Sequence, residues 1–548
     1  MSLRHFPFRL FIIVGSLQGL HALHAQLGVS PSQNAAFLRE LRERHTDKTS
    51  PDPLGDDRAA LQRSRSLTEP DYLSDSISSA VRLAGDYSTY SGQFQADRAF
   101  LSPWSGTLLT PETTPTGAAA PLAVALDQTF EWNSVSSNLR GSREAFLSTS
   151  QISLAGVYGS LETGRLSLQA AGGFSLAESD SLLLPNQDGT LAYFIRPGST
   201  LSFDIQRGPF TLTLYDRVSA RPDALLGMRS FSSDYFSVIQ NDLGAALAVN
   251  LARGLTFTAD FNWSSSQSMR DTRFAIPNRD VHSLLASLAY EIRPGWRVGL
   301  EGGQAWTNYE GVFNADGKQW HGGLFTEATV PWSHRLRLEG GAQGMSFDAL
   351  PPTILFPPPV FPVGILPTLN TGDQSDLSAS PYYSLTLSGR LCQSVTHELS
   401  AGYEAALTPA SNYVQSHYVN YGIHTALWRG AALGLSGFLE STRDSGGLYA
   451  ANTQLTGGVA QLQQKLGSKL SLTIGYGFTH IDPNAQPQSP FVSSADLNQH
   501  AYSAALAYQL CPRSSLNLGW QHFETTAPGF NFGTVRQERV TLGMRVVF

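Results

Sequence analysis

Apolar and polar residues alternate with a period of two over most of the chain, from about Leu122 to the C-terminus. Clear examples are the segments 166–176, 255–263 and 470–478. In each, every second residue is apolar or Gly, and the residues between are mostly Ser, Thr, Gln, Asp, Asn or Gly. Because successive side chains of a β-strand point to opposite faces, each segment predicts a strand with one apolar and one polar face.

Tight turns, several of them containing Gly or Pro, join these segments in pairs, as in β-hairpins. Longer polar stretches separate the pairs, so short and long connections are expected to alternate strictly along the chain. The long stretches include 219–235, 265–280, 347–380 and 480–499. The nine tight turns lie at 161–165, 206–209, 251–254, 292–295, 331–334, 392–396, 428–430, 467–469 and 511–514.

The number of strands follows from these turns. Nine hairpins predict 18 strands, and the alternating stretches 122–132 and 535–548 add one strand each, which gives 20 with a range of 18 to 22. An even number places both ends of a closed antiparallel barrel at one rim, and short turns opposite long loops are typical of membrane barrels. A soluble β-sandwich or propeller does not explain that asymmetry. The predicted fold class is all-β: a single transmembrane antiparallel up-and-down β-barrel with a mostly disordered N-terminal extension.

Charged residues of both signs occupy the polar faces of the predicted strands. So many charges require water or one another, so we expect the polar faces to line a hydrated lumen and the apolar faces to contact lipid. The two signs are equally frequent, which predicts no strong charge selectivity, although a grouping of Arg335, Arg337, Arg539 and Arg545 on one wall would create a transverse field. The acidic positions are Asp204, Asp260, Glu291, Glu301, Glu327, Glu339, Glu398, Glu404 and Glu440, and the basic ones are Arg165, Arg217, Arg297, Arg335, Arg337, Arg390, Lys465, Arg539 and Arg545.

Aromatic residues lie in or beside the tight turns. They are Phe210, Trp296, Trp332 and Trp428. Aromatic side chains are enriched at the boundary between lipid headgroups and hydrocarbon, so these four predict an interfacial girdle at the rim of short turns.

The first 120 residues differ from the alternating body. Residues 1–25 have two arginines, an apolar stretch and Ala22 and Ala25 before Gln26, which is the layout of a secretory signal peptide. Residues 26–120 are first rich in charge and then in Ser, Thr, Pro and Gly, which predicts a low-order extension. The expected organisation is a signal peptide at 1–25, the extension at 26–120 and the barrel at 121–548.

Composition excludes several other classes of protein. The chain is 41% hydrophobic and 15% charged, with a net charge of −7 and a mean hydropathy of −0.14. These values argue against a bundle of membrane helices. The slightly acidic balance is not that of a nucleic-acid-binding protein. We found no enzyme motif and no metal-ligand spacing, so we expect no catalytic residue, cofactor or metal. The two cysteines, Cys392 and Cys511, lie in distant turns and are expected not to pair.

The C-terminal segment RVTLGMRVVF carries a family resemblance. Val540, Leu542, Met544, Val546 and Phe548 share one face of it. A terminal aromatic residue preceded by alternating apolar residues resembles the closing strand of Gram-negative outer-membrane β-barrels. The resemblance implies recognition by the barrel-assembly machinery and residence in outer-membrane lipid. By architecture, residues 122–548 resemble porin-like barrels.

The expected function is a porin-like channel for passive diffusion of small hydrophilic solutes. Two alternatives stay open: an outer-membrane conduit for export of polysaccharide or other cargo with periplasmic partners, and a surface adhesion or structural barrel. Residues 351–367, PPTILFPPPVFPVGILP, either constrict the lumen or form an external contact surface. Porins are often trimers, so a homo-oligomer is compatible with this prediction, but no face is identifiable as a subunit contact.

Overall fold

A computed structural model describes most of the alternating body of the chain. The predicted signal peptide, the N-terminal extension and the proline-rich segment 351–367 lie outside the described residues. The described residues are 122–548 except 138–140, 161, 178–189, 222–237, 269–277, 311–315, 331–333, 349–375, 408–412, 429, 446–451, 484–496, 512 and 528–532.

The described residues form 20 β-strands, which confirms the predicted number. The first ten are β1 (Ala123–Ser137), β2 (Gly141–Ser160), β3 (Gly164–Ala177), β4 (Thr190–Arg207), β5 (Phe210–Arg221), β6 (Val238–Ala252), β7 (Leu255–Ser268), β8 (Asn278–Arg293), β9 (Trp296–Glu310) and β10 (Gly317–Val330). The others are β11 (His334–Phe347), β12 (Leu377–Cys392), β13 (Val395–Leu407), β14 (Tyr413–Trp428), β15 (Ala431–Ser445), β16 (Asn452–Leu466), β17 (Leu470–Pro483), β18 (Leu497–Cys511), β19 (Ser514–Ala527) and β20 (Gly533–Val547).

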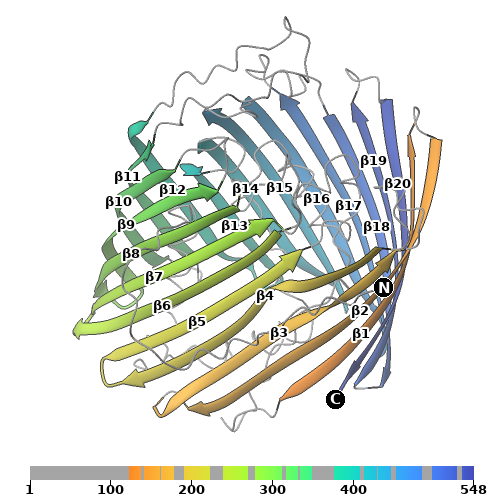
Figure 1. Ribbon diagram of the computed structural model, residues 1–548, viewed down its shortest axis with the longest axis horizontal. Coiled ribbons are helices and arrows are strands. Elements are labelled where there is room, and N and C mark those ends of the chain that lie inside the picture. The colour runs from red at the N-terminus through yellow and green to blue at the C-terminus, as the bar shows by residue number, and fades with distance from the viewer. Residues whose placement is uncertain are drawn as a thin grey trace, which may run out of the picture.

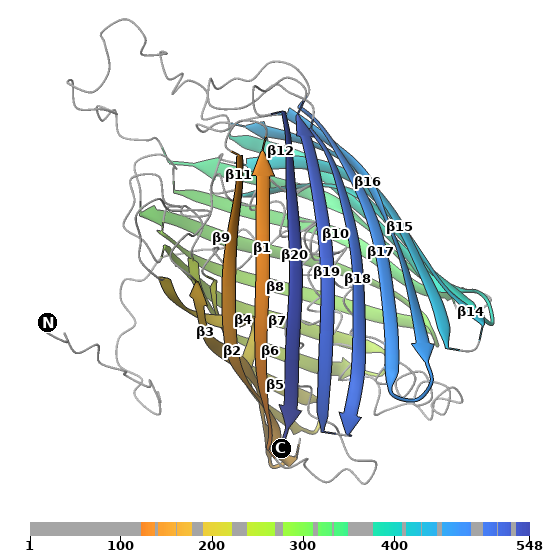
Figure 2. The same ribbon diagram turned by 90° about the vertical axis from the view of Figure 1, so that its right-hand side faces the viewer.

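The strands close into one antiparallel barrel. Each strand pairs with the next along the chain, and β20 pairs with β1 in a register that places Val547 opposite Ala125 (Figures 1 and 2). The amide of Phe548 donates to the carbonyl oxygen of Val124 at 2.8 Å, so the start of β1 and the end of β20 meet at the same rim. Closure leaves no unpaired sheet edge, which is the condition for spanning a bilayer with strands.

All nine predicted tight turns join consecutive strands at this rim. Glycine supplies the backbone conformation at several of them: φ is +79° at Gly254, Gly295 and Gly430 and +82° at Gly467. This left-handed region is costly for residues with a Cβ, so glycine at these positions lets the hairpin reverse within a few residues. We call this the short-turn rim.

The expectation of strictly long connections at the opposite rim is wrong. Only residues 138–140 separate β1 from β2, and only 528–532 separate β19 from β20, whereas 348–376 separate β11 from β12. The strands are 12 to 20 residues long, while about 9 to 11 residues cross a bilayer. Several polar stretches therefore continue the strand pairing beyond the bilayer instead of forming loops. We call the rim opposite the short-turn rim the far rim.

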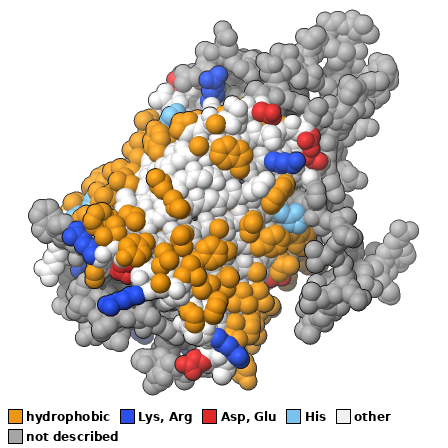
Figure 3. All heavy atoms as spheres, turned by 90° about the vertical axis from the view of Figure 1, so that its left-hand side faces the viewer, with side chains coloured by type: hydrophobic (Ala, Val, Ile, Leu, Met, Phe, Trp, Pro, Cys, Tyr) orange, Lys and Arg blue, Asp and Glu red, His pale blue; other side chains and the backbone are white. Residues whose placement is uncertain are grey.

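Burial separates the two faces of the wall. On β10, buried Gln319, His321 and Phe325 alternate with exposed Trp320 and Leu324. Figure 3 shows one side of the barrel, where hydrophobic side chains cover much of the surface and charged side chains lie toward its edges. No helix among the described residues is long and apolar enough to cross a membrane. An apolar exterior around a polar interior is the arrangement of a transmembrane barrel.

Candidate functional site: the charged lumen wall

Two arcs of the lumen wall differ in their charged residues. The acidic arc comprises β7 to β15, and the paired arc comprises β16 to β20 with β1 to β6. Among the described side chains, the acidic arc places Asp260, Glu291, Glu301, Glu327, Glu339, Glu398, Glu404 and Glu440 on the lumen face, with Arg297, Arg335, Arg337 and Arg390. The paired arc carries Asp127, Glu131, Asp204 and Asp242 with Arg165, Arg217, Lys465, Arg539 and Arg545.

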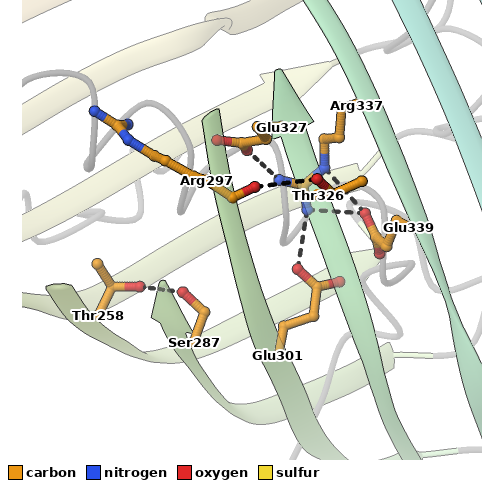
Figure 4. A network of polar contacts seen from close by, with 8 residues as sticks. All are labelled: Thr258, Ser287, Arg297, Glu301, Thr326, Glu327, Arg337 and Glu339. Carbon is orange, nitrogen blue, oxygen red and sulfur yellow. Dashed lines mark hydrogen bonds and ion pairs between the residues drawn. The ribbon is translucent and has the colours of Figure 1, made fainter. Parts of the chain in front are cut away.

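The acidic arc contains a network in which one arginine binds three carboxylates (Figure 4). Nη2 of Arg337 donates to Oε2 of Glu301 at 2.9 Å and to Oε2 of Glu339 at 2.8 Å, while Nη1 donates to Glu327. Strand register produces this arrangement, because Glu327 on β10 lies directly opposite Arg337 on β11. The side chain of Arg337 is only 8% exposed, so its charge is compensated by these acids rather than by bulk water.

An aromatic ring supports the guanidinium group from the wall side. The guanidinium carbon of Arg337 lies 4.7 Å from the centre of the Phe325 ring, a cation–π distance. The ring in turn covers Gly299 on β9, where a Cβ would lie 2.4 Å from the Phe325 Cζ atom. Glycine, aromatic ring and arginine therefore form three layers, and any side chain at position 299 would displace the ring.

A tyrosine lies across two glycines beside this network. Glu301, Gly323, Gly341 and Tyr382 are register partners across β9 to β12. A Cβ at Gly323 would meet the Tyr382 hydroxyl at 2.4 Å, and a Cβ at Gly341 would meet its ring at 2.8 Å. The ring therefore spans the space that the two glycines leave open, and it points toward Glu301 at the other end of this line of register partners.

The same packing occurs in the paired arc around Tyr215. Its hydroxyl donates to Oδ1 of Asp260 at 3.1 Å, and the Arg217 guanidinium carbon lies 4.7 Å from its ring centre. A Cβ at Gly244, the register partner of Tyr215, would lie 2.2 Å from the ring. Sequence reasoning missed these lumen-facing aromatics. An aromatic residue on the polar face of one strand, paired with a glycine on the next, would have indicated this packing. That pairing can be recognised only when the strand register is known.

The ion pairs of the paired arc that face the lumen join arginines to acids on an adjacent strand. Arg165 contacts Asp204 at 2.8 Å, and Thr213 also donates to this carboxylate. Across the closure of the barrel, Nε of Arg539 lies 3.0 Å from Glu131, and Nε of Arg545 lies 3.5 Å from Asp127. Each of these pairs connects two adjacent strands and neutralises charge locally.

The structure brings only some of the predicted lumen residues together. Arg337, Glu301 and Glu339 share one network. Arg297, Arg335 and Arg390 lie closer to the short-turn rim, and Glu404 lies on β13. The four arginines whose grouping would create a transverse field do not share one wall: Arg335 and Arg337 are on β11, whereas Arg539 and Arg545 are on β20 in the other arc. Arg337 contacts acids on β9, β10 and β11, and Arg539 and Arg545 contact acids on β1, so these arginines do not form a positive wall facing a negative one.

The predicted aromatic and assembly residues lie on the exterior. Phe210, Trp296 and Trp428 are 51%, 37% and 60% exposed beside the short-turn rim, and Trp332 lies outside the described residues. Cys392 and Cys511 are both free and exposed. On β20 the residues Val540, Leu542, Met544 and Val546 share the outward face, and Phe548 follows the strand.

The lumen wall can bind polar groups but shows no metal centre. Among the described residues, no group of three or more His, Cys, Asp or Glu side chains is arranged to hold a metal ion. Carboxylates, guanidinium groups, hydroxyls and amides line the wall, so its chemistry is that of reversible hydrogen bonding and ion pairing with solutes.

Comparisons with known proteins identify similar structures but no family. A scan of protein-family models and a search of curated proteins find no match. Similar solved structures from Pseudomonas aeruginosa include OpdQ, with 12% identity over 78% of this chain and 99% of that chain and a TM-score of 0.40. OccK2 (OpdF), in complex with glucuronate, has 10% identity over 78% and 98% with a TM-score of 0.38. The siderophore receptor PirA has 11% identity over 78% and 80% with a TM-score of 0.41.

The strand pairing and the two faces of the wall define the fold without these comparisons. Every one of the 20 strands has two antiparallel neighbours, large apolar side chains face outward, and charged side chains such as Arg337 and Arg165 form ion pairs within the lumen. The chain is a 20-stranded transmembrane β-barrel with a charged lumen wall.

Proposed function

We propose that the protein is a channel for passive diffusion of small hydrophilic solutes. The observation that carries this proposal is a closed 20-stranded wall whose inner face is polar and charged. With strands about 4.8 Å apart and tilted by about 40°, such a wall is roughly 40 Å across between backbones. Inward side chains fill the interior of an eight-stranded barrel, but they do not fill one of this width. The width therefore supports an aqueous path.

The acidic arc supports local binding of solutes along this path. Its carboxylates outnumber its arginines, and Glu327 is the most exposed of the three acids around Arg337, at 18% of its side chain. A passing solute with hydroxyl or cationic groups meets hydrogen-bond acceptors there, while the paired arc presents neutralised pairs. The proposed solutes are therefore small and hydrophilic.

Planar-bilayer recording tests the proposal. The folded full-length chain is expected to produce discrete open-channel currents that scale with salt concentration. Variants lacking 26–120 or 351–367 are recorded in parallel, because either segment is a candidate plug. Absence of current from the full chain and from both deletion variants would contradict a passive channel, and it would favour the adhesion or structural alternative. Current that appears only with an added periplasmic partner would favour the export conduit.

We further propose that the barrel resides in the outer membrane of a Gram-negative bacterium and that the C-terminal strand is its assembly signal. The alternating outward residues of β20 and the exposed terminal Phe548 support this. Replacing Phe548 with Gln is expected to reduce the amount of folded barrel in the outer membrane of a Gram-negative host. The same variant is expected to refold in detergent like the unsubstituted chain, because Phe548 is 64% exposed. Equal assembly of both chains in cells would contradict the role of Phe548.

A further inference from the structure

The outer face of the barrel carries an apolar groove across β14 to β17. Its floor is Gly437 on β15 and Gly458 on β16, which are directly paired. Its two sides are Tyr421 on β14, the register partner of Gly437, and Phe478 on β17, the register partner of Gly458. The groove has a volume of about 380 Å³. All four residues are on the outward face, so the groove opens toward lipid and not toward the lumen.

No described side chain fills the floor of this groove. A Cβ at Gly437 would meet nothing closer than the Gly457 carbonyl oxygen at 3.7 Å, an ordinary contact distance. The lumen glycines Gly244, Gly299 and Gly341 differ, because aromatic rings occupy the space beside them. Internal packing therefore does not explain the open floor at Gly437.

The wall becomes polar between the groove and the far rim. On the outward face of β15, Leu439, Ser441 and Arg443 follow Gly437, and Gln454 on β16 lies opposite Ser441. Arg443 is exposed, and no ion pair of this side chain occurs among the described residues. The outward groups on either side are His417 on β14 and His480 and Asp482 on β17, and Asp482 lies opposite Gln454 rather than beside Arg443.

The spacing along β15 matches one leaflet of a bilayer. Gly437 is six residues from the first residue of β15, Ala431, and six residues from Arg443. Six residues span about 20 Å along a strand and, at a tilt of about 40°, about 15 Å along the membrane normal. The hydrocarbon core of a bilayer is about 30 Å thick. When the glycine pair lies at the midplane, Arg443 is therefore at the level of the headgroups.

We propose that this surface binds an anionic membrane lipid from the leaflet on the far-rim side. An acyl chain lies over Gly437 and Gly458 between Tyr421 and Phe478, and the negatively charged headgroup contacts Arg443. The bilayer position of the groove selects an acyl chain as its occupant, and the exposed guanidinium of Arg443 at headgroup height, which has no ion pair among the described residues, selects negative charge. This proposal concerns the outer face and is independent of solute passage through the lumen.

Native mass spectrometry of the detergent-solubilised full chain tests the proposal. The chain is incubated with equal amounts of phosphatidylglycerol and phosphatidylcholine that have identical acyl chains, so only headgroup charge differs. The unsubstituted barrel is expected to retain several times more phosphatidylglycerol. Equal retention of the two lipids would overturn the preference for an anionic headgroup.

Two variants assign the contacts, and each has a matched control on β10. Arg443→Gln is expected to abolish the preference for phosphatidylglycerol, whereas Lys318→Gln, which removes another exposed cation near the far rim, preserves it. Gly437→Leu is expected to reduce retention of both lipids by filling the groove. Gly322→Leu is the control, because it adds the same side chain at an outward glycine whose nearest atom to a Cβ is 4.0 Å away.

The folded state of each variant is checked by heat-modifiable mobility on gels. If Gly437→Leu does not fold, Gly437→Val replaces it as a smaller filler of the groove. Loss of preference to the same extent in Arg443→Gln and Lys318→Gln would overturn the assignment of the headgroup contact. Equal lipid retention by the folded variants at 437 and 322 would overturn the assignment of the acyl-chain groove.

Discussion

The acidic arc and the paired arc use the same residue types on the same face of the wall, yet they compensate charge differently. In the acidic arc Arg337 contacts Glu301, Glu327 and Glu339. In the paired arc Arg165 contacts Asp204, Arg539 contacts Glu131 and Arg545 contacts Asp127. The local ratio of acids to arginines, rather than the number of charges in the lumen, therefore sets how many carboxylates depend on one arginine for compensation.

Arg337 is the residue on which the acidic network depends. Removal of one member of a buried ion pair leaves an uncompensated charge, which costs more than the pair contributes to stability. For Arg337 the loss leaves three carboxylates close together, two of them at most 4% exposed. For Arg539 the loss leaves Glu131, which is 14% exposed.

The largest expected effect comes from Arg337→Met. The variant should lower the free energy of unfolding by about 3–5 kcal/mol, the range for breaking a buried ion pair. Arg539→Met, the matched change in the paired arc, should have less than half this effect, because one partly hydrated carboxylate remains. Urea unfolding of the barrel in lipid vesicles, followed by heat-modifiable mobility, measures both. Equal losses would remove the distinction between the arcs.

A smaller effect is expected from adding one methyl group to lumen glycines. Gly341→Ala in the acidic arc places a Cβ 2.2 Å from the Gly322 carbonyl oxygen and 2.8 Å from the Tyr382 ring. It should destabilise the barrel by about 1–3 kcal/mol through overpacking. In the paired arc, Gly543→Ala meets nothing closer than 3.6 Å and should change stability by less than about 0.5 kcal/mol. The same unfolding assay compares them, and a neutral Gly341→Ala would show that both the backbone at Gly322 and the Tyr382 ring can shift to admit the methyl group.

The smallest expected effect concerns ion selectivity. Glu327→Gln removes one negative charge from the acidic arc and should lower the ratio of cation to anion permeability by about twofold, since a screened charge in a hydrated lumen contributes only a fraction of a kcal/mol. The double variant Arg165→Gln and Asp204→Asn removes a neutral pair from the paired arc and should leave the ratio unchanged. Reversal potentials in a salt gradient measure the ratio. A larger shift in the double variant would contradict the contrast between the arcs.

Much of the fold was predictable because the alternation within each strand shows which of its faces is apolar and which is polar. The alternation around Phe257, Phe261 and Asp260 correctly indicated which side chains meet lipid and which meet the lumen. The nine tight turns were equally local, because glycine at positions such as Gly254 permits the required positive φ. The lengths of the far-rim connections were not predictable in this way, because polar residues there continue strand pairing that depends on the neighbouring strand.

The contacts within the site required information that no single strand contains. Glu327 meets Arg337 because the register of β10 and β11 places them opposite each other, and Tyr382 covers Gly341 and Gly323 for the same reason. A shift of two residues would preserve every apolar and polar face while changing all of these partners. The period, the tight turns and the two faces of the wall follow from the sequence alone, since these are properties of one strand or one hairpin. Which charges, rings and glycines are neighbours follows instead from the stagger of the strands around the closed barrel, which no local segment encodes.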